Sequence, residues 1–182
     1  MKAMVVYESM FGATHEVAAA VAEGLRARFD VVDVVPVAGA DSARTVEVDL
    51  LVVGGPTHAH GMSRPSTRQA AVEHPDKYAP AQQVELGADG IGVREWLEGL
   101  PFTKGFAAAF DTRGDAPAML TGRASSRISH RLRRAGRTIV VPAESFVVAK
   151  GGALRFGEHD RAVAWGRTVA AVASSELAGH AV

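Results

Sequence analysis

Short apolar segments recur along the chain, and five of them have the length and composition of β-strands. They are Lys2–Tyr7, Phe29–Pro36, Asp49–Gly55, Gly105–Phe110 and an extended stretch from Thr138 to Ala149. The third segment is apolar without alternation, which is typical of a parallel strand covered on both faces. Pro142 interrupts the last stretch, and this indicates an edge position, where a proline is tolerated. The pattern therefore predicts a largely buried parallel sheet.

Segments with the apolar spacing of helices lie between and after these strands. They are His15–Arg28, Ser66–Glu73, Val93–Leu100, Ala118–Ala135 and Glu158–Leu177, and Ala40–Val46 has the features of a short helix or turn with Asp41 or Ser42 as its cap. Strands that alternate with helices imply right-handed crossovers and an α/β fold with a doubly wound sheet. At 182 residues, the chain has the length of one domain with a sizeable core, so we expect residues 1–182 to form a single domain.

The first loop, Glu8–Thr14, joins a strand to a helix and has the arrangement that binds phosphate. Backbone N–H groups and the positive end of the helix would face an anion, and Ser9 and Thr14 add hydroxyl donors. Thr14 is also a candidate N-cap of the helix. The loop lacks the G-x-G-x-x-G run of dinucleotide folds, and no lysine follows Gly12 as in a nucleoside-triphosphate loop. An ordinary strand-to-helix turn is the alternative.

The letters S-M-F-G-A-T of this loop resemble the flavodoxin phosphate loop, S/T-x-S/T-G-x-T. The resemblance implies that the loop holds the phosphate of non-covalent FMN through Ser9, Met10, Phe11, Gly12, Ala13 and Thr14. Phe11 stands where most members of the family carry a hydroxyl, so one donor is lost. The resemblance covers nearly the whole chain and implies a flavodoxin-like five-stranded parallel sheet of order 2-1-3-4-5.

A second loop, Pro56–Met62, follows the third strand and would face the first loop across the crevice between strands one and three. Its G-P-T-x-x-x-G run is similar to the flavodoxin loop that flanks the flavin ring, which the resemblance assigns to Pro56, Thr57, His58, Ala59, His60 and Gly61. An aromatic residue commonly stacks there, and a histidine in its place covers less apolar ring area. Each histidine has a solvent-facing position as its alternative, and a metal site from both lacks an evident third ligand.

A third loop, Asp111–Gly114, follows the fourth strand beside the same crevice. In flavodoxins the matching loop covers the second face of the flavin, so the resemblance adds Asp111, Thr112, Arg113 and Gly114 to the cofactor site. A cation close to the ring makes the negative charge of a reduced flavin less costly, so Arg113 would raise the reduction potential. The alternative is that Arg113 is exposed or paired with Asp111 or Asp115.

The stretch 63–104 is longer than the single helix that a flavodoxin needs between strands three and four, so we expect an insertion there. Within it, His74–Asp89 has two prolines and a weak apolar pattern, which is typical of a loop. Such segments serve as lids or partner surfaces, or are tolerated without a function. The sequence leaves these alternatives open.

Charge and composition narrow the classes of function. Twenty basic and twenty acidic residues give a net charge of zero, which disfavours nucleic-acid binding. The absence of cysteine excludes disulfides, thiolate catalysis and cysteine-ligated metals, and it fits a cytoplasmic location. No apolar run approaches the roughly 18 residues of a membrane helix, and no signal peptide is evident, so we expect no membrane association.

The helix predicted after strand four carries a stripe of arginines, at positions 123, 127, 131 and 134. No acidic residue lies between Asp115 and Glu144. The stripe is either a solvated basic face or a docking surface for an acidic redox partner, because charge complementarity speeds encounter. Many flavodoxins are strongly acidic, so this stripe departs from the family pattern.

Three hypotheses about function follow. The first is an FMN-binding redox protein, monomeric or homodimeric, that transfers electrons to or from a partner protein. The second is an FMN-dependent NAD(P)H:quinone-type reductase that uses a small-molecule electron acceptor. The third is a flavodoxin-fold interaction domain that no longer binds FMN, which Phe11 and the absence of Trp or Tyr from Pro56–Met62 favour. No nucleophile–base pair stands out, so hydrolysis is not expected.

Overall fold

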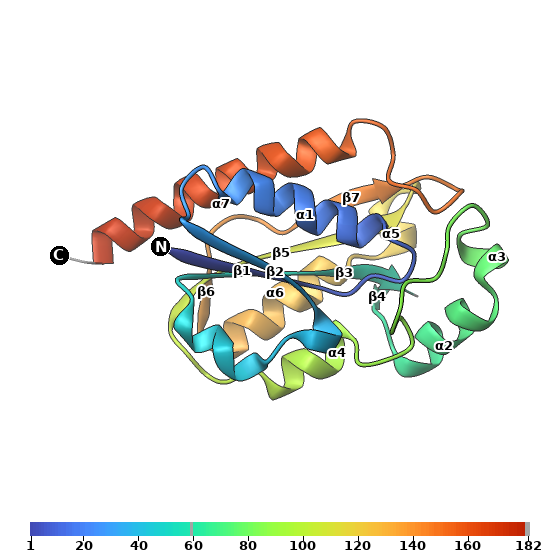
Figure 1. Ribbon diagram of the computed structural model, residues 1–182, viewed down its shortest axis with the longest axis horizontal. Helices are drawn as coiled ribbons and strands as arrows, with labels where there is room; N and C mark the ends of the chain where they lie inside the picture. The colour runs from blue at the N-terminus through green and yellow to red at the C-terminus, as the bar shows by residue number, and fades with distance from the viewer. Residues whose placement is uncertain (59, 181–182) are drawn as a thin grey trace.

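The computed structural model describes residues 1–58 and 60–180, and it consists of a central sheet with helices on both faces (Figure 1). The strands are β1 (Lys2–Tyr7), β2 (Val31–Pro36), β3 (Leu50–His58), β4 (Gly61–Met62), β5 (Gly105–Gly114), β6 (Arg137–Ile139) and β7 (Glu144–Val148). The α-helices are α1 (Ala13–Leu25), α2 (Pro65–Glu73), α3 (Pro75–Tyr78), α4 (Val93–Trp96), α5 (Ala118–Thr121), α6 (Ala124–Arg134) and α7 (Glu158–His180). Three 3₁₀ helices are η1 (Val37–Gly39), η2 (Ser42–Glu47) and η3 (Leu97–Gly99).

The parallel strands lie in the order β2-β1-β3-β5-β6, and β7 also pairs with β5. Val5 in the middle of β1 is paired with Val34 of β2 and with Val52 of β3. The predicted order 2-1-3-4-5 is confirmed, because β5 is the fourth parallel strand and β6 and β7 share the place of the fifth. The predicted last strand is divided: β6 pairs with the first half of β5 and β7 with the second half, and Pro142 lies between them.

Two segments predicted as loops are strands. β3 continues through Pro56 to His58, and β4 returns antiparallel to it, with His58 paired to Gly61. β5 likewise continues through Asp111–Gly114. The physical reason is that each extension gains a hydrogen-bonding neighbour, β4 for β3 and β7 for β5, and the spacing of apolar residues cannot reveal such pairing in advance.

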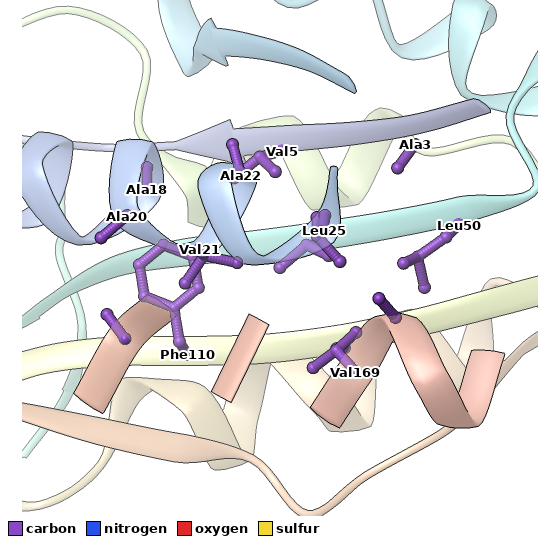
Figure 2. Close-up of a cluster of buried hydrophobic side chains, with 14 of the residues drawn as sticks. Ala3, Val5, Ala18, Ala20, Val21, Ala22, Leu25, Leu50, Phe110 and Val169 are labelled. Carbon is purple, nitrogen blue, oxygen red and sulfur yellow. The ribbon is translucent and has the colours of Figure 1, made fainter. Parts of the chain in front are cut away.

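Helices α1 and α7 cover one face of the sheet, and α4 and α6 cover the other (Figure 1). Figure 2 shows Val21 and Leu25 of α1 packed over Leu50 and Phe110 of the sheet. All four side chains are fully buried. Apolar side chains at helical spacing thus meet the inward side chains of the strands, as the amphipathic pattern of α1 requires.

The segment Ala118–Ala135, predicted as one helix, is divided into α5 and α6. Gly122 lies between them with a φ of 77°, a conformation that favours glycine. A Cβ at Gly122 would overlap the backbone of His60, so the break lets the chain approach the β3–β4 hairpin closely. No helix in the described part of the chain is long and apolar enough to cross a membrane.

The expected insertion, residues 63–104, has two parts with different contacts. α4 and η3 take the place of the covering helix: Trp96 is buried against the sheet and donates a hydrogen bond from Nε1 to the carbonyl of Ala40 at 2.8 Å. The segment from α2 to Ala88 instead packs against the first loop, where Ala71 and Ala88 contact Met10 and Phe11. Phe11 thus contributes to the contact between the first loop and the insertion.

Candidate functional site

A cleft of about 330 Å³ opens at the carboxyl ends of β1, β3 and β5, beside the point where the strand order reverses. The predicted cofactor residues that line it are Met10, Phe11, Ala13, Thr14, Pro56, Thr57, His58, Thr112, Arg113 and Gly114. The structure thus brings the three predicted segments together around one cavity. Its volume is at the lower end of the range for small-molecule sites.

The remaining predicted residues are not part of this lining. They are Ser9, Gly12, His60, Gly61 and Asp111, and Ala59 lies outside the described residues. Ser9 instead lines a smaller cavity of about 230 Å³ on the other side of β1, together with Glu8 and His15.

Helix α1 begins at Ala13, and its N-terminus opens onto the cleft. Gly12 is the N-cap with a φ of 94°, and no side-chain hydrogen bond caps the helix within the part of the chain that the structure describes. The prediction of Thr14 as N-cap is therefore wrong. Thr14 is buried, and its hydroxyl forms a 2.7 Å hydrogen bond with the hydroxyl of Thr112 on β5 instead. Ser9 supports the loop from within, because its Oγ accepts a hydrogen bond from the backbone N–H of Gly12 at 3.1 Å.

The end of β3 forms one wall of the cleft. Thr57 joins this wall to α6, since its Oγ1 accepts a hydrogen bond from the N–H of Ala124 at 3.0 Å. His58 lines the cleft, and burial together with the positive charge of Arg68 lowers its pKa below the usual range of histidine. His60 is exposed at the hairpin turn with a φ of 70°. The two histidines thus have different surroundings, and no group of three metal-ligating side chains forms in residues 1–58 and 60–180.

The end of β5 forms the wall next to it. Thr112 lines the cleft, whereas Asp111 is buried and accepts a hydrogen bond from the N–H of Ser125 at 2.7 Å. Asp111 therefore holds the first turn of α6. Arg113 donates hydrogen bonds to the carbonyls of Ala116 and Gly114, and no ion pair joins it to a carboxylate in the described residues.

Several lining residues are missed by the sequence reasoning. They are Tyr78, Ala79, Asp115, Val148, Ala149, Lys150 and Gly152. Lys150 follows the last strand of the sheet. Because the carboxyl ends of parallel strands meet at one edge, its position after a strand could have identified it as a lining residue. Tyr78 and Ala79 lie at the end of α3 in the insertion, where the sequence offers no corresponding signal.

Charged side chains form a buried cluster where the end of β1, α2 and α4 meet. Glu8 follows β1 and is 4% exposed, and its Oε2 accepts a hydrogen bond from the N–H of Val93 at 2.8 Å. Arg68 is 2% exposed, donates to Ser63 Oγ at 3.0 Å, and pairs with Glu95 at 3.0 Å. Burial raises the pKa of Glu8, although the hydrogen bonds from Ser63 and Val93 and the charge of Arg68 oppose this shift.

We expect Glu8→Gln to change how stability depends on pH. The pKa of Glu8 is raised in the folded state. The stability that Glu8 contributes to the folded protein is therefore fully present below the ordinary carboxyl pKa and is lost as pH rises through the folded pKa. The variant should therefore gain stability relative to the wild type with rising pH over this range, by up to about 1.4 kcal/mol per pH unit. Urea unfolding at a series of pH values measures this difference, and parallel stability curves for the two proteins would contradict it.

Comparisons with known proteins identify the fold. No protein-family model matches the chain, and a search of curated proteins gave no match either. Among solved structures, an archaeal flavodoxin superposes with a TM-score of 0.66 at 20% identity, covering 96% of this chain and 99% of its own. Flavodoxin 2 from Bacillus cereus superposes with a TM-score of 0.64 at 18% identity, covering 94% of this chain and 99% of its own.

The Flv1 flavodiiron core from Synechocystis sp. PCC6803 gives a TM-score of 0.62 at 16% identity, covering 97% of this chain but 36% of its own. The likeness to all three structures extends over almost all of the present chain. The chain therefore has a flavodoxin-like α/β fold.

Proposed function

We propose that the cleft binds FMN non-covalently and that the protein transfers electrons to or from a partner. The observation that carries the proposal is the N-terminus of α1, which no side chain of the described residues caps and which opens onto a cleft at the switch point of the sheet. Free N–H groups and the helix dipole at such a position favour an anion. The flavodoxin-like fold supports the choice of a flavin, and FMN carries the phosphate that this end of the cleft suits.

The lining fits the two chemically different ends of FMN. Arg113 and Lys150 provide positive charge, and Thr14 and Thr112 provide hydroxyls. Nε of Arg113 is buried and has no hydrogen-bond partner among the described residues, so a donor remains available. The apolar and aromatic side chains of the lining, among them Met10, Phe11, Pro56 and Tyr78, suit a flat ring system.

When bound, FMN supplies the reversible uptake of one or two electrons. The chain's own residues would bind and orient it: α1 and its loop would hold the anionic end, and the walls from β3 and β5 would contact the other end. Burial and the charge of Arg68 lower the pKa of His58, and this favours its neutral form. Arg113 is then a nearby source of positive charge, and this would favour the reduced, anionic form of the cofactor.

The test is a titration of the purified protein with FMN, followed by flavin fluorescence and absorbance. We expect saturable binding at micromolar or tighter affinity. Ala13→Asp places a carboxylate in the first turn of α1, where it stabilises the helix but repels an anion in the cleft. The variant should fold as well as the wild type and bind FMN roughly tenfold to a hundredfold more weakly, since such charges interact by about 1–3 kcal/mol.

The matched control is Ser66→Asp, which adds the same charge to the first turn of α2 at an exposed position outside the cleft. It should leave the affinity for FMN unchanged. Absence of binding up to millimolar FMN would overturn the proposal, and equal affinities of Ala13→Asp and the wild type would show that the phosphate lies elsewhere.

A further inference from the structure

A set of arginines lies on α4, on α6 and at the N-caps of α6 and α2, and we call it the arginine face: Arg94, Arg127, Arg131, Arg123 and Arg64. Arg94 donates hydrogen bonds from Nε to the carbonyl of Ser63 at 2.8 Å and from Nη2 to that of Met62 at 2.7 Å. Burial and the positive charges of Arg64, Arg127 and Arg131 lower the pKa of Arg94, although the charge of Glu95 opposes this shift, so these three arginines lie near Arg94.

The carboxylates near this face leave much of its charge unbalanced. Glu98 pairs with Arg131 at 3.2 Å, and Glu95 is engaged by the buried Arg68. Residues 116–143, which include all of α6, contain no Asp or Glu. Since the whole chain has a net charge of zero, the positive charge of this face is a local excess.

The arginine face is continuous with a wall of the cleft. A Cβ at Gly61 on β4 would lie 2.8 Å from Nε of Arg127, so this arginine lies directly on the β3–β4 hairpin. The same hairpin is joined to α6 through Thr57 and Ala124, and Thr57 also lines the cleft. A protein bound to the arginine face would therefore contact the element that borders the proposed cofactor site.

We propose that the arginine face docks an acidic surface of the redox partner protein, an inference that rests on the proposed function. The planar guanidinium group pairs with carboxylates in two-point geometry, and the Arg131–Glu98 pair shows that a guanidinium of this face can engage a carboxylate. A complementary charge would steer the partner to the side of the molecule that adjoins the cleft. An acidic protein is favoured over a nucleic acid because the chain has no net charge to attract an extended polyanion.

The test uses a peptide of 20 glutamates as the probe of an acidic surface, with the ¹⁵N-labelled wild-type protein at low salt. We expect backbone amide shifts confined to α4, α6 and the β3–β4 hairpin, and binding that weakens steeply as salt is added. The triple variant R64Q/R123Q/R127Q should bind the peptide at least tenfold more weakly. All three positions are exposed, and glutamine keeps part of the apolar stem, so folding is preserved.

The matched control is R26Q/R28Q/R167Q, which removes the same number of charges from exposed positions of α7 and the end of α1, on the opposite face of the sheet. It should bind the peptide nearly as the wild type does. Equal losses in both triple variants, or shifts spread over the whole surface, would overturn the proposal, as would tighter binding of a single-stranded DNA 20-mer than of the peptide.

An FMN titration of the same two variants separates the two proposals. Neither variant changes the lining of the cleft, so both should bind FMN as the wild type does. If FMN fails to bind while the peptide binds at the arginine face, the proposed function is wrong, but the arginine face is still a binding site for acidic chains. If FMN binds and the peptide does not distinguish the two variants, the docking inference is wrong and the cofactor site stands.

Discussion

Gly166→Ala is expected to destabilise the fold by about 3 kcal/mol, because it inserts a methyl group where two helices are in backbone contact. A Cβ at Gly166 of α7 would lie well under 3.0 Å from the carbonyl oxygen of Val21 on α1. Gly24 of α1 makes the reciprocal approach to the backbone of Val163 and Arg167. Both helices pack on the same face of the sheet, so neither can move away without opening the core shown in Figure 2.

The same helix offers its own control. Gly179 is exposed near the end of α7, and a Cβ added there would have no atom of the described residues within 4 Å. Gly179→Ala should therefore be neutral or stabilising by about 0.5–1 kcal/mol through helix propensity. Urea unfolding of both variants measures the contrast. A loss below about 1 kcal/mol for Gly166→Ala would show that α1 and α7 can separate easily, contrary to the packing described above.

The parts of the fold that can be predicted from the sequence are those that depend on residues close together along the chain. Lys2–Tyr7 is predicted and observed as β1, because a short apolar run that ends at a polar turn is typical of a buried strand. The location of the cleft follows from the same reasoning, since the segments that end β1, β3 and β5 must meet at one edge of the sheet. Ten predicted positions therefore fall in a single lining although they come from three distant segments.

The parts that the sequence does not reveal depend on distant partners. The extension of β5 through Asp111–Gly114 depends on its pairing with β7, and the side chain of Thr14 is directed by Thr112, 98 residues further on. Phe11, interpreted from the sequence as the loss of a hydroxyl donor, also has a role that depends on distant residues. Phe11 packs against a buried cluster of Met10, Ala71 and Ala88, two of which come from an insertion without a clear pattern, and this contact explains why an aromatic side chain suits the loop.

The buried charges are a third case, in which a local signal exists but is ambiguous. Glu8 directly follows an apolar strand, and Arg68 lies on α2, a helix of mixed composition. A polar residue at the end of a strand is usually a loop residue that faces solvent. Only the arrival of α4 over Glu8 and the turn of Arg68 towards Ser63 and Glu95 make these side chains part of the interior.

Arg68→Met should therefore destabilise the protein by about 3–5 kcal/mol, although the new side chain is apolar and of similar length. Arg68 is almost completely buried, and its removal takes a hydrogen bond from Ser63 and the ion-pair partner from Glu95. It also removes a positive charge that partly offsets the burial of Glu8. Arg64→Met, at an exposed position one turn earlier, is the matched control and should cost less than about 1 kcal/mol.

Two further measurements show whether the loss is electrostatic. The charge of Arg68 is one of the two causes that lower the pKa of His58, so an NMR titration of Arg68→Met should find that pKa raised towards the ordinary value. The double variant Glu8→Gln/Arg68→Met should lose less stability than the sum of the losses of the two single variants, because the carboxylate of Glu8 that Arg68 compensates is then absent. Strict additivity, with an unchanged pKa of His58, would mean that Arg68 stabilises α2 through packing alone. In that case the cluster would have no electrostatic influence on the cleft, and the neutrality of His58 would depend on burial only.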